Sequence, residues 1–382
     1  MERLTAPQGT FELERHPVRK NETLRAWDAA DEYLLRHVAD AGIALDGTVL
    51  IVNDEFGALA TAFATHSPIS FGDSYLAHAG TRANFERNGL DPAAVTATPS
   101  LGALPECIDV VLLKIPKSTA LLEEQLRRIA PTLHGGSVFV AAAMAKHIHT
   151  STLEVFERFI GPTKTSLAEK KARLVFSTFG AGEPKATTWP QTFTIPPENQ
   201  VVVSHAGVFA AGRLDVGTRF FLETLKTTAA PETVVDLGCG NGILGMMTAM
   251  FNPEADLTFV DESYLAMASA EATFRANLGA SRAAKFVVGN ALFDTADPAD
   301  RIAAGSVDRV LCNPPFHANQ AVGDATAWSM FADARDALRP GGSLWVIGNR
   351  HLAYHAKLKR LFGDCDVVNA NSKFVVLRSM KG

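Results

Sequence analysis

The segment Asn313-Pro314-Pro315-Phe316-His317 directly follows Val307–Cys312, an apolar run typical of a buried strand. An exocyclic amine on a planar base is a poor nucleophile because its lone pair is delocalised into the ring. The Asn313 side-chain oxygen and the Pro314 carbonyl could accept its two N–H groups and aim the lone pair at a methyl donor. The prolines fix the loop backbone, and Phe316 offers a flat face for a base. The segment therefore predicts methyl transfer to a conjugated nitrogen; the simpler interpretation is a turn after a strand.

A second segment combines a carboxylate, an amide and three glycines: Asp236, Gly238, Gly240, Asn241 and Gly242. It lies where a strand pattern changes to a helical one, so small residues let the backbone approach a ligand and the helix N-terminus directs free N–H groups at it. Asp261 ends the next apolar run, 21 residues after Gly240. A carboxylate at that place can accept both hydroxyls of an adenosine ribose.

The kind of ligand follows from two departures from the dinucleotide fingerprint. Ile243 stands where GxGxxG requires its third glycine. The carboxylate of Asp236 would meet a pyrophosphate unfavourably, whereas it suits the positively charged end of a sulfonium ligand. The pattern therefore predicts S-adenosylmethionine and disfavours a nicotinamide dehydrogenase.

The elements that must hold these segments alternate between strand and helix patterns. The expected strands are 48–53, 109–113, 138–142, a run beginning at 234, 257–260, 307–312 and 343–348, and the expected helices are 27–39, 58–64, 121–133, 243–251 and 327–338. Residues 1–25 read as an irregular tail or an edge element, 177–200 as a linker, and 317–324 as a mobile lid. The alternation predicts parallel α/β sheets in two domains, 1–195 and 196–382.

The second half of the chain repeats the first. The matched pairs, in the same order in both halves, are Asp73–Ala77 with Glu262–Ala266, Asn88 with Asn277, Ile108-Asp109 with Val307-Asp308, and His134–Ser137 with Pro340–Ser343. Chance similarity between α/β units could give one such match, but four in order predict an internal duplication.

The first copy has lost the residues that predict chemistry in the second. Glu55 stands in place of Gly240, Gly72 in place of Asp261, and Lys114-Ile-Pro-Lys117 in place of the Asn313 segment. We expect this half to bind no cofactor and to bind or orient RNA, with a purely structural companion domain as the alternative. The candidate phosphate contacts are Lys114, Lys117, Arg127, Arg128 and Lys146, together with Arg350 in the basic C-terminal segment.

Composition limits the class of protein. The chain has 382 residues, 47% of them apolar and 20% charged, as expected for a globular protein of two domains. It shows no apolar run of membrane-spanning length and no signal-peptide core, so we expect a cytoplasmic protein without membrane contact. The four cysteines lie far apart and form no CxxC pair, which indicates free thiols and no metal site. A net charge of −5 is unusual for a nucleic-acid binder.

The segment from Asp236 to Gly242, the position of Asp261 and the Asn313 segment together resemble the class I S-adenosylmethionine-dependent methyltransferases, in particular the ribosomal RNA guanine-N2 methyltransferases. Residues 207–210 and 214–218 resemble the stretch that closes over the methionine end of the cofactor in that family. Residues 26–35 and the chain length resemble the large-subunit (23S) branch more than the small-subunit (16S) branch.

This resemblance implies two tandem Rossmann-like class I methyltransferase domains from an internal duplication, the N-terminal one degenerate. It implies methyl transfer to N2 of a guanine in 23S ribosomal RNA, and no obligate protein partner. The implied cofactor-binding residues are Asp236, Gly238, Gly240, Asn241, Gly242, Asp261, Asn290 and Asn313. Asp261 would hold the ribose, and Asn290 would lie near the adenine, where many relatives carry Asp. Asn313 to Phe316 would hold the target base, and His317 would either contact the substrate or be a surface residue.

Three other functions stay open at this point. A 16S ribosomal RNA guanine-N2 methyltransferase would share the two-domain plan. A protein-glutamine methyltransferase acts on a similarly conjugated nitrogen, although its loop usually ends in Tyr rather than Phe. A non-catalytic RNA-binding scaffold would keep the fold alone, which the intact set of Asp236, Gly240, Asp261 and Asn313 argues against.

Overall fold

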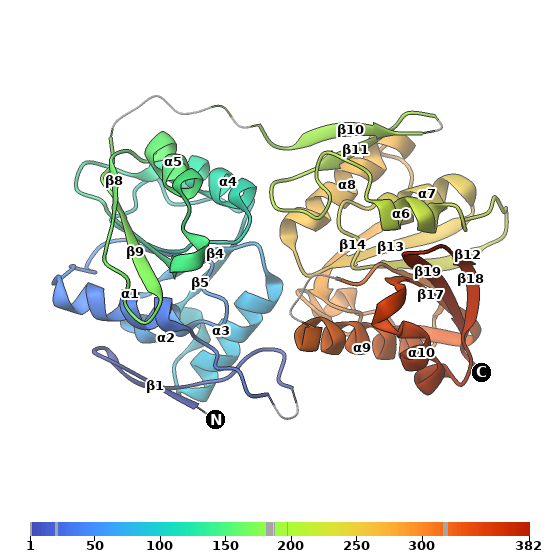
Figure 1. Cartoon of the computed structure of the whole chain (residues 1–382), viewed down its shortest axis with the longest axis horizontal. Coiled ribbons are helices and arrows are strands. Elements are labelled where there is room, and N and C mark those ends of the chain that lie inside the picture. The colour runs from blue at the N-terminus through green and yellow to red at the C-terminus, as the bar shows by residue number, and fades with distance from the viewer. Residues whose placement is uncertain (1, 20–21, 181–185, 187, 197, 316–319) are drawn as a thin grey trace. The chain divides into compact units, whose positions relative to one another are not determined.

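The computed structural model describes residues 2–19, 22–180, 186, 188–196, 198–315 and 320–382. The chain divides into two compact units, Met1–Thr188 and Trp189–Gly382, each with its own sheet and helices (Figure 1). No helix in this described part of the chain combines the length and the apolar character needed to cross a membrane.

The first unit contains a seven-stranded sheet of order β5-β4-β3-β6-β7-β9-β8. Its strands are β3 (Val49–Val52), β4 (Ile69–Gly72), β5 (Thr96–Pro99), β6 (Val110–Lys114), β7 (Val138–Met144), β8 (Thr163–Thr165) and β9 (Ala172–Ser177), and its helices are α1 (Ala29–Asp40), α2 (Ala58–Ala62), α3 (Tyr75–Arg87), α4 (Thr119–Ile129) and α5 (Thr150–Phe159). The first five strands in this order, β5, β4, β3, β6 and β7, run parallel. Strand β9 pairs antiparallel with β7, and β8 pairs antiparallel with β9. Buried side chains of α1 and α2 pack on one face, and those of α4 and α5 pack on the other.

The second unit contains an eight-stranded sheet of order β15-β14-β13-β12-β16-β17-β19-β18. Its strands are β12 (Glu232–Leu237), β13 (Ala255–Asp261), β14 (Lys285–Asn290), β15 (Asp294–Thr295), β16 (Val307–Cys312), β17 (Leu338–Asn349), β18 (Asp366–Ala370) and β19 (Phe374–Met380), and its helices are α6 (Val216–Leu222), α7 (Ile243–Phe251), α8 (Tyr264–Leu278), α9 (Gln320–Ala337) and α10 (Tyr354–Phe362). Side chains of α6, α7 and α8 cover one face, and those of α9 and α10 cover the other. Apart from β15, the strand order matches that of the first unit.

Each unit begins with an antiparallel hairpin, formed by β1 (Glu2–Ala6) with β2 (Gly9–Leu13) and by β10 (Gln191–Ile195) with β11 (Gln200–Ser204). The expectation of an irregular tail is therefore wrong for the described residues up to Leu13, which form a separate two-stranded sheet. The predicted linker, 177–200, likewise contains β10. Both hairpins are fixed by long-range contacts that a local pattern does not reveal.

The helix after Asn313 also differs from its prediction. Helix α9 begins at Gln320 rather than Ala327, so residues 320–324 are helical and not part of a mobile loop. Asp324 pairs with Lys357 of α10, with 2.7 Å between Oδ1 and Nζ, which ties this first part of α9 to its neighbour. The remainder of the predicted lid lies outside the described residues.

Candidate functional site

The sequence-predicted residues of the second unit meet at one edge of its sheet. Strands β12, β13, β14 and β16 run parallel in adjacent positions. Asp236 lies near the end of β12, Asp261 ends β13, Asn290 ends β14, and Asn313 directly follows β16. In an open α/β sheet this carboxyl edge, beside the central strands, is where ligands bind.

The glycine loop uses its three glycines differently. Gly238, Gly240 and Gly242 all have positive φ, at 69°, 56° and 76°. A Cβ added at Gly240 would meet no atom within 4 Å, whereas one at Gly242 would lie 2.8 Å from the Ala270 Cα in α8. Gly240 therefore leaves open space for a ligand, and Gly242 permits close packing of α7 on α8. The predicted contacts of Gly238 and Gly242 with the cofactor stay predictions.

The side chain of Asn241 ties the same loop to β11. Its Nδ2 donates to the Ser204 hydroxyl at 3.2 Å, and the residue is buried. Its predicted contact with the cofactor stays a prediction, and the bond to Ser204 gives the side chain a structural role in addition.

Two carboxylates lie beside Gly240: Asp236, which is buried, and Asp261, which is half-buried. The Asp236 Oδ2 accepts from the Gly245 N–H at 2.8 Å, while its buried Oδ1 has no hydrogen-bond partner among the described residues. Asp261 accepts from the Gly240 N–H at 2.9 Å and from the Ser263 N–H at 3.0 Å. Burial, with a contribution from Asp261, raises the pKa of Asp236 to about 7, and burial also raises the pKa of Asp261. Buried acids with an unused acceptor fit a ligand that carries positive charge and hydroxyl groups.

Asn313 presents one free acceptor. Its Nδ2 donates to the Thr218 hydroxyl oxygen in α6 at 3.2 Å, and its buried Oδ1 has no partner in the described part of the chain. Pro314 is buried and Pro315 is exposed. Phe316 and His317 lie outside the described residues. An oriented carboxamide oxygen without a partner is suited to accept an N–H from a ligand. Sequence reasoning included Thr218 only within a resembling segment and did not foresee this contact.

Asn290 and Arg350 have protein partners. The Asn290 Nδ2 lies 3.4 Å from the Asp294 Oδ2, so the contact of Asn290 with an adenine stays a prediction. Arg350 is exposed and donates to the Asn371 carbonyl at 3.0 Å.

The corresponding edge of the first unit is closed by protein groups. The Lys114 ammonium, at the end of β6, lies 2.8 Å from Asp28 and 2.7 Å from Asp31. Beside it, Asn53 and Gln125 exchange hydrogen bonds of 2.9 and 2.7 Å between their side-chain amides. Because two carboxylates hold its ammonium group, Lys114 is not retained among the residues proposed to contact RNA.

A buried carboxylate also remains in the first unit, at a different place in the loop. The Asp54 Oδ2 accepts from the Ala60 N–H in α2 at 2.8 Å. Burial, with a contribution from Asp31, raises the pKa of Asp54 to about 7. The acid therefore holds the start of the helix although Glu55 has replaced the open glycine.

The other candidate phosphate contacts of this unit fall into two groups. Arg127 pairs with Glu124 at 2.7 Å, and Arg128 donates to the Gly102 carbonyl at 2.6 Å. Lys117 and Lys146 are exposed, and the described residues give neither a carboxylate partner. Burial, with Lys146 and Lys117 next in effect, lowers the pKa of His147, so both ammonium groups lie near this imidazole.

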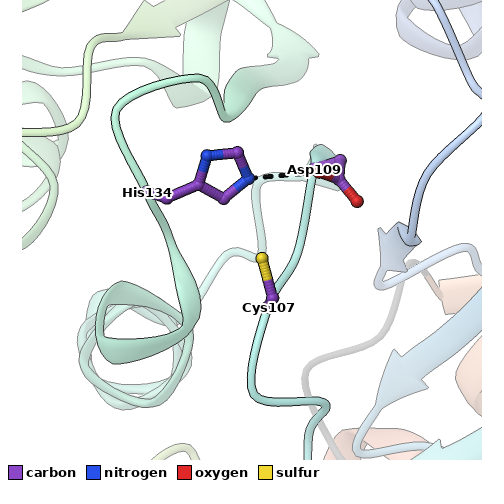
Figure 2. Close-up of side chains that lie close together, drawn as sticks. All are labelled: Cys107, Asp109 and His134. Carbon is purple, nitrogen blue, oxygen red and sulfur yellow. Dashed lines mark hydrogen bonds and ion pairs between the residues drawn. The ribbon is translucent and has the colours of Figure 1, made fainter.

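Cys107, Asp109 and His134 form a cluster that the sequence did not reveal (Figure 2). The His134 Nδ1 accepts from the Gly136 N–H at 3.1 Å, so its Nε2 carries the proton and donates to the Asp109 Oδ1 at 3.1 Å. The other Asp109 oxygen accepts from the Thr48 N–H at 2.7 Å, just before β3. Because both ring nitrogens and both carboxylate oxygens have partners, the cluster acts as a cap on the strand.

Comparisons with known proteins agree with this geometry. A family model described as the RLMG N-terminal domain matches residues 1–181, and one described as the methyltransferase small domain matches residues 199–378. The solved structure of a 16S rRNA N2 methyltransferase from T. thermophilus, in complex with AdoMet and guanosine, superposes with a TM-score of 0.77 at 19% identity, covering 100% of this chain and 98% of that one. The protein therefore has the α/β fold of the class I methyltransferases.

Curated relatives are similar over their full length. The ribosomal RNA large subunit methyltransferase G of Streptomyces griseus is 53% identical over 390 residues, covering 100% of both chains. The protein of the same name from Aeromonas hydrophila is 45% identical over 378 residues, covering 97% of this chain and 96% of that one. These matches confirm the resemblance seen in the sequence, and the chain belongs to the ribosomal RNA large subunit methyltransferase G family.

Proposed function

We propose that this protein transfers a methyl group from S-adenosylmethionine to the exocyclic N2 of a guanine in 23S ribosomal RNA. The relatives' shared name, which specifies the large ribosomal subunit, supports 23S over 16S RNA. With ribosomal RNA as the substrate, the reaction takes place in the cytoplasm. The observation that carries the proposal is the Asn313 carboxamide, with its nitrogen held by Thr218 and its buried oxygen free to accept.

The residues of the site divide between two tasks. Asp236, Asp261 and the open face of Gly240 would hold the cofactor, which supplies an electrophilic methyl group when bound. The Asn313 Oδ1 and the Pro314 carbonyl would each accept one N–H of the guanine amine, which favours a lone pair directed out of the ring plane. Because N2 faces the minor groove inside a helix, the target base must be unpaired or flipped out to reach them. A general base is not required before attack, since the amine becomes acidic once it is methylated.

Mapping of modified guanines in ribosomal RNA tests the proposal. Cells that lack the protein should lose one N2-methylated guanine from 23S RNA, and expression of the intact protein should restore it. Loss of the modification from 16S RNA instead would identify the small-subunit activity. Unchanged ribosomal RNA with loss of methyl from a protein glutamine would identify the protein methyltransferase, and no change in any of these would favour the scaffold.

The Asp236 pKa gives a prediction about cofactor affinity. With a pKa of about 7 in the free protein, this carboxyl is half ionised at pH 7 and must lose its proton to hold a cationic ligand. A proton therefore competes with the ligand as the pH falls, and between pH 7 and 5.5 the affinity for S-adenosylmethionine should fall about tenfold. The ligand's α-amino group stays protonated over this range and adds no opposing change. Titration calorimetry at each pH measures the effect.

Asp236→Asn is the control for that titration. The amide cannot ionise, so its affinity should be lower at pH 7 and nearly independent of pH down to 5.5. Asp261, whose pKa burial also raises, remains in this variant. A slope equal to that of the native protein would assign the titration to Asp261 and contradict the role given to Asp236.

We further propose that the two units arose by duplication, because residues at corresponding positions make the same contacts in both units. The Asn88 side chain exchanges hydrogen bonds of 2.9 and 2.8 Å with the Glu12 main chain in β2, and Asn277 does the same with Val201 in β11 at 2.9 and 2.7 Å. In both units this amide docks the leading hairpin on a helix. Shared strand order alone could arise independently, but the same side chain in the same contact favours common descent.

A second matched device lies at the other end of the sheets. The Asp109 Oδ2 accepts from the Thr48 N–H at 2.7 Å, and the Asp308 Oδ2 accepts from the Thr233 N–H at 2.8 Å. Asp308 pairs through its other oxygen with Arg339, whereas Asp109 pairs with His134. The carboxylate cap is retained and only its cationic or N–H partner has changed, which supports the duplication.

For the first unit we propose a role in orienting RNA through the surface that contains Lys117 and Lys146. Replacing both lysines with Ala should reduce the slope of log affinity against log salt by about 1.5 and weaken RNA binding severalfold at low salt. Filter binding across a salt series measures both quantities. The charge-matched control is Arg82→Ala with Lys164→Ala, two exposed residues of the same unit. An identical loss in the control, or no change in either variant, would contradict the assignment.

A further inference from the structure

The Asn313 side chain needs a fixed orientation to serve the proposed reaction. The two ends of a carboxamide are alike in shape but opposite in function, because the oxygen accepts and the nitrogen donates. One orientation offers the guanine amine an acceptor, and the flipped one sets an NH₂ group against it. Resting on the proposed function, we propose that Thr218 is the positioning residue that holds the Asn313 carboxamide with its oxygen toward the target amine.

Thr218 is itself firmly held. Asp215 is the N-terminal cap of α6, and its Oδ2 accepts from the Thr218 backbone N–H at 3.0 Å. Thr218 is also buried. A Cβ added at Gly217 would lie 3.0 Å from the Asp215 Oδ2, 3.4 Å from Phe374 and 3.5 Å from Ile347, so this turn packs closely on its own cap and on the sheet. Phe221, one turn later, is fully buried. A displacement of the Thr218 hydroxyl, which accepts from Asn313, would therefore require α6 to lose its packing on the sheet.

The first unit shows the same contact with different chemistry. There Asp28 caps α1, and the residue three positions later, Asp31, receives the Lys114 ammonium at 2.7 Å. In the second unit Asp215 caps α6, and the residue three positions later, Thr218, receives the Asn313 Nδ2 at 3.2 Å. In the first unit the contact joins the third residue of α1 to the end of β6, the strand beside β3. In the second unit it joins the third residue of α6 to the residue that follows β16, the strand beside β12.

The two contacts have the same polarity, which agrees with the Thr218 hydroxyl acting as the acceptor from the Asn313 Nδ2. A hydroxyl can donate as well as accept, so its presence alone would allow either orientation of Asn313. In the first unit the helix residue is a carboxylate, which can only accept, and the strand-end residue is an ammonium, which can only donate. With the same direction in the second unit, Asn313 donates through Nδ2 and its oxygen is left for the substrate. In the first unit the donor is the Lys114 ammonium, which has no acceptor atom, so this contact leaves no group that could accept an N–H from a substrate.

Loss of the Thr218 hydroxyl should therefore act on turnover rather than on cofactor binding. Thr218→Val keeps the volume and removes the acceptor, so the carboxamide can rotate and kcat should fall about tenfold or more. The affinity for S-adenosylmethionine should fall much less than kcat if the hydroxyl acts through Asn313. Thr218→Ser keeps the hydroxyl and should stay close to the native kcat. Thr224→Val is the matched control, because the Thr224 hydroxyl donates to the Phe221 carbonyl at 2.7 Å and not to the site.

A double-mutant cycle separates positioning from a general loss of structure. In single-turnover experiments, Thr218→Val should lower the rate in the native background and have no further effect in an Asn313→Ala background, because the group it orients is then absent. Equal losses in both backgrounds, a native kcat for Thr218→Val, or an affinity loss as large as the loss in kcat would overturn the proposal. If Thr218→Val does not fold, Thr218→Ala takes its place in the same cycle. A native protein without activity on ribosomal RNA would refute the proposed function itself, whereas an active native protein with an additive cycle would refute only the role of Thr218.

Discussion

Asn313→Ala is expected to lower kcat about thousandfold, the upper range for removing one preorganised polar contact from a transition state. The side-chain oxygen is buried and has no partner among the described residues, so its hydrogen-bonding capacity is available to the substrate. Without it, one N–H of the guanine amine loses its acceptor and the lone pair remains conjugated with the ring. The affinity for S-adenosylmethionine should fall much less than kcat, because Asp236, Asp261 and Gly240 are untouched.

Steady-state rates on ribosomal RNA from cells lacking the protein, together with calorimetric titration of the cofactor, measure the two quantities. Asn369→Ala is a suitable control, because that asparagine lies in β18 and its Oδ1 accepts only the neighbouring Ala370 N–H at 3.0 Å among the contacts described. The control should keep the native rate. If Asn313→Ala weakens cofactor binding as much as it slows turnover, the residue holds the cofactor and does not shape the amine.

Elements with strong local patterns were predictable from the sequence. Helix α7 (Ile243–Phe251) and strand β16 (Val307–Cys312) begin and end where their apolar patterns predict. Helix α7 is buried from Ile243 to Ala249, and β16 is buried at Val307 and from Val310 to Cys312, so the apolar positions of both elements carry the pattern. The alternation of strands and helices also predicted which residues meet at one edge of the sheet, because parallel strands bring their carboxyl ends together.

Features that depend on contacts distant in the sequence were not predictable. Lys114 read as a free cation, but Asp28 and Asp31, more than 80 residues earlier, hold its ammonium. Asn88 and Asn277 were recognised as a matched pair, yet their common task appears only when the hairpins are seen beside them. In each case a side chain bonds polar groups of an element far away in the sequence, and the hydrophobic periodicity of a segment gives no information about such contacts.

The predictions for the lid and for the glycine loop were also incomplete, because contacts with neighbouring helices are not visible in the local sequence. The segment 317–324 contains Gly323 and polar residues and reads as a loop, whereas residues 320–324 are helical and the ion pair between Asp324 and Lys357 joins the beginning of α9 to α10. Gly242 fits a ligand-binding motif by its spacing, whereas the structure shows that it makes room for Ala270. Spacing identifies the motif, and the close packing on Ala270 gives Gly242 a structural reason to be glycine in addition to its predicted contact with the cofactor.

Asp261→Ala is expected to weaken S-adenosylmethionine binding about a hundredfold, since hydrogen bonds to a charged group contribute about 1.5–3 kcal/mol each. The carboxylate has two tasks in our proposal. It accepts from the N–H groups of Gly240 and Ser263, which sets the shape of the glycine loop, and its remaining lone pairs would receive the ribose hydroxyls. Asp261→Asn keeps one acceptor oxygen and should lose only about tenfold.

Calorimetry at pH 8, which lies above the pKa of about 7 for Asp236, reduces the contribution of Asp236 titration to this measurement. Asp256→Ala is the control, because it removes an exposed carboxylate from the beginning of the same strand, β13. At saturating cofactor, Asp261→Ala should recover most of the native kcat, whereas Asn313→Ala should not. Because one residue is proposed to hold the cofactor and the other to prepare the amine, the two variants should show opposite patterns of affinity and turnover. The same pattern in both would mean that the two tasks are not divided between these residues.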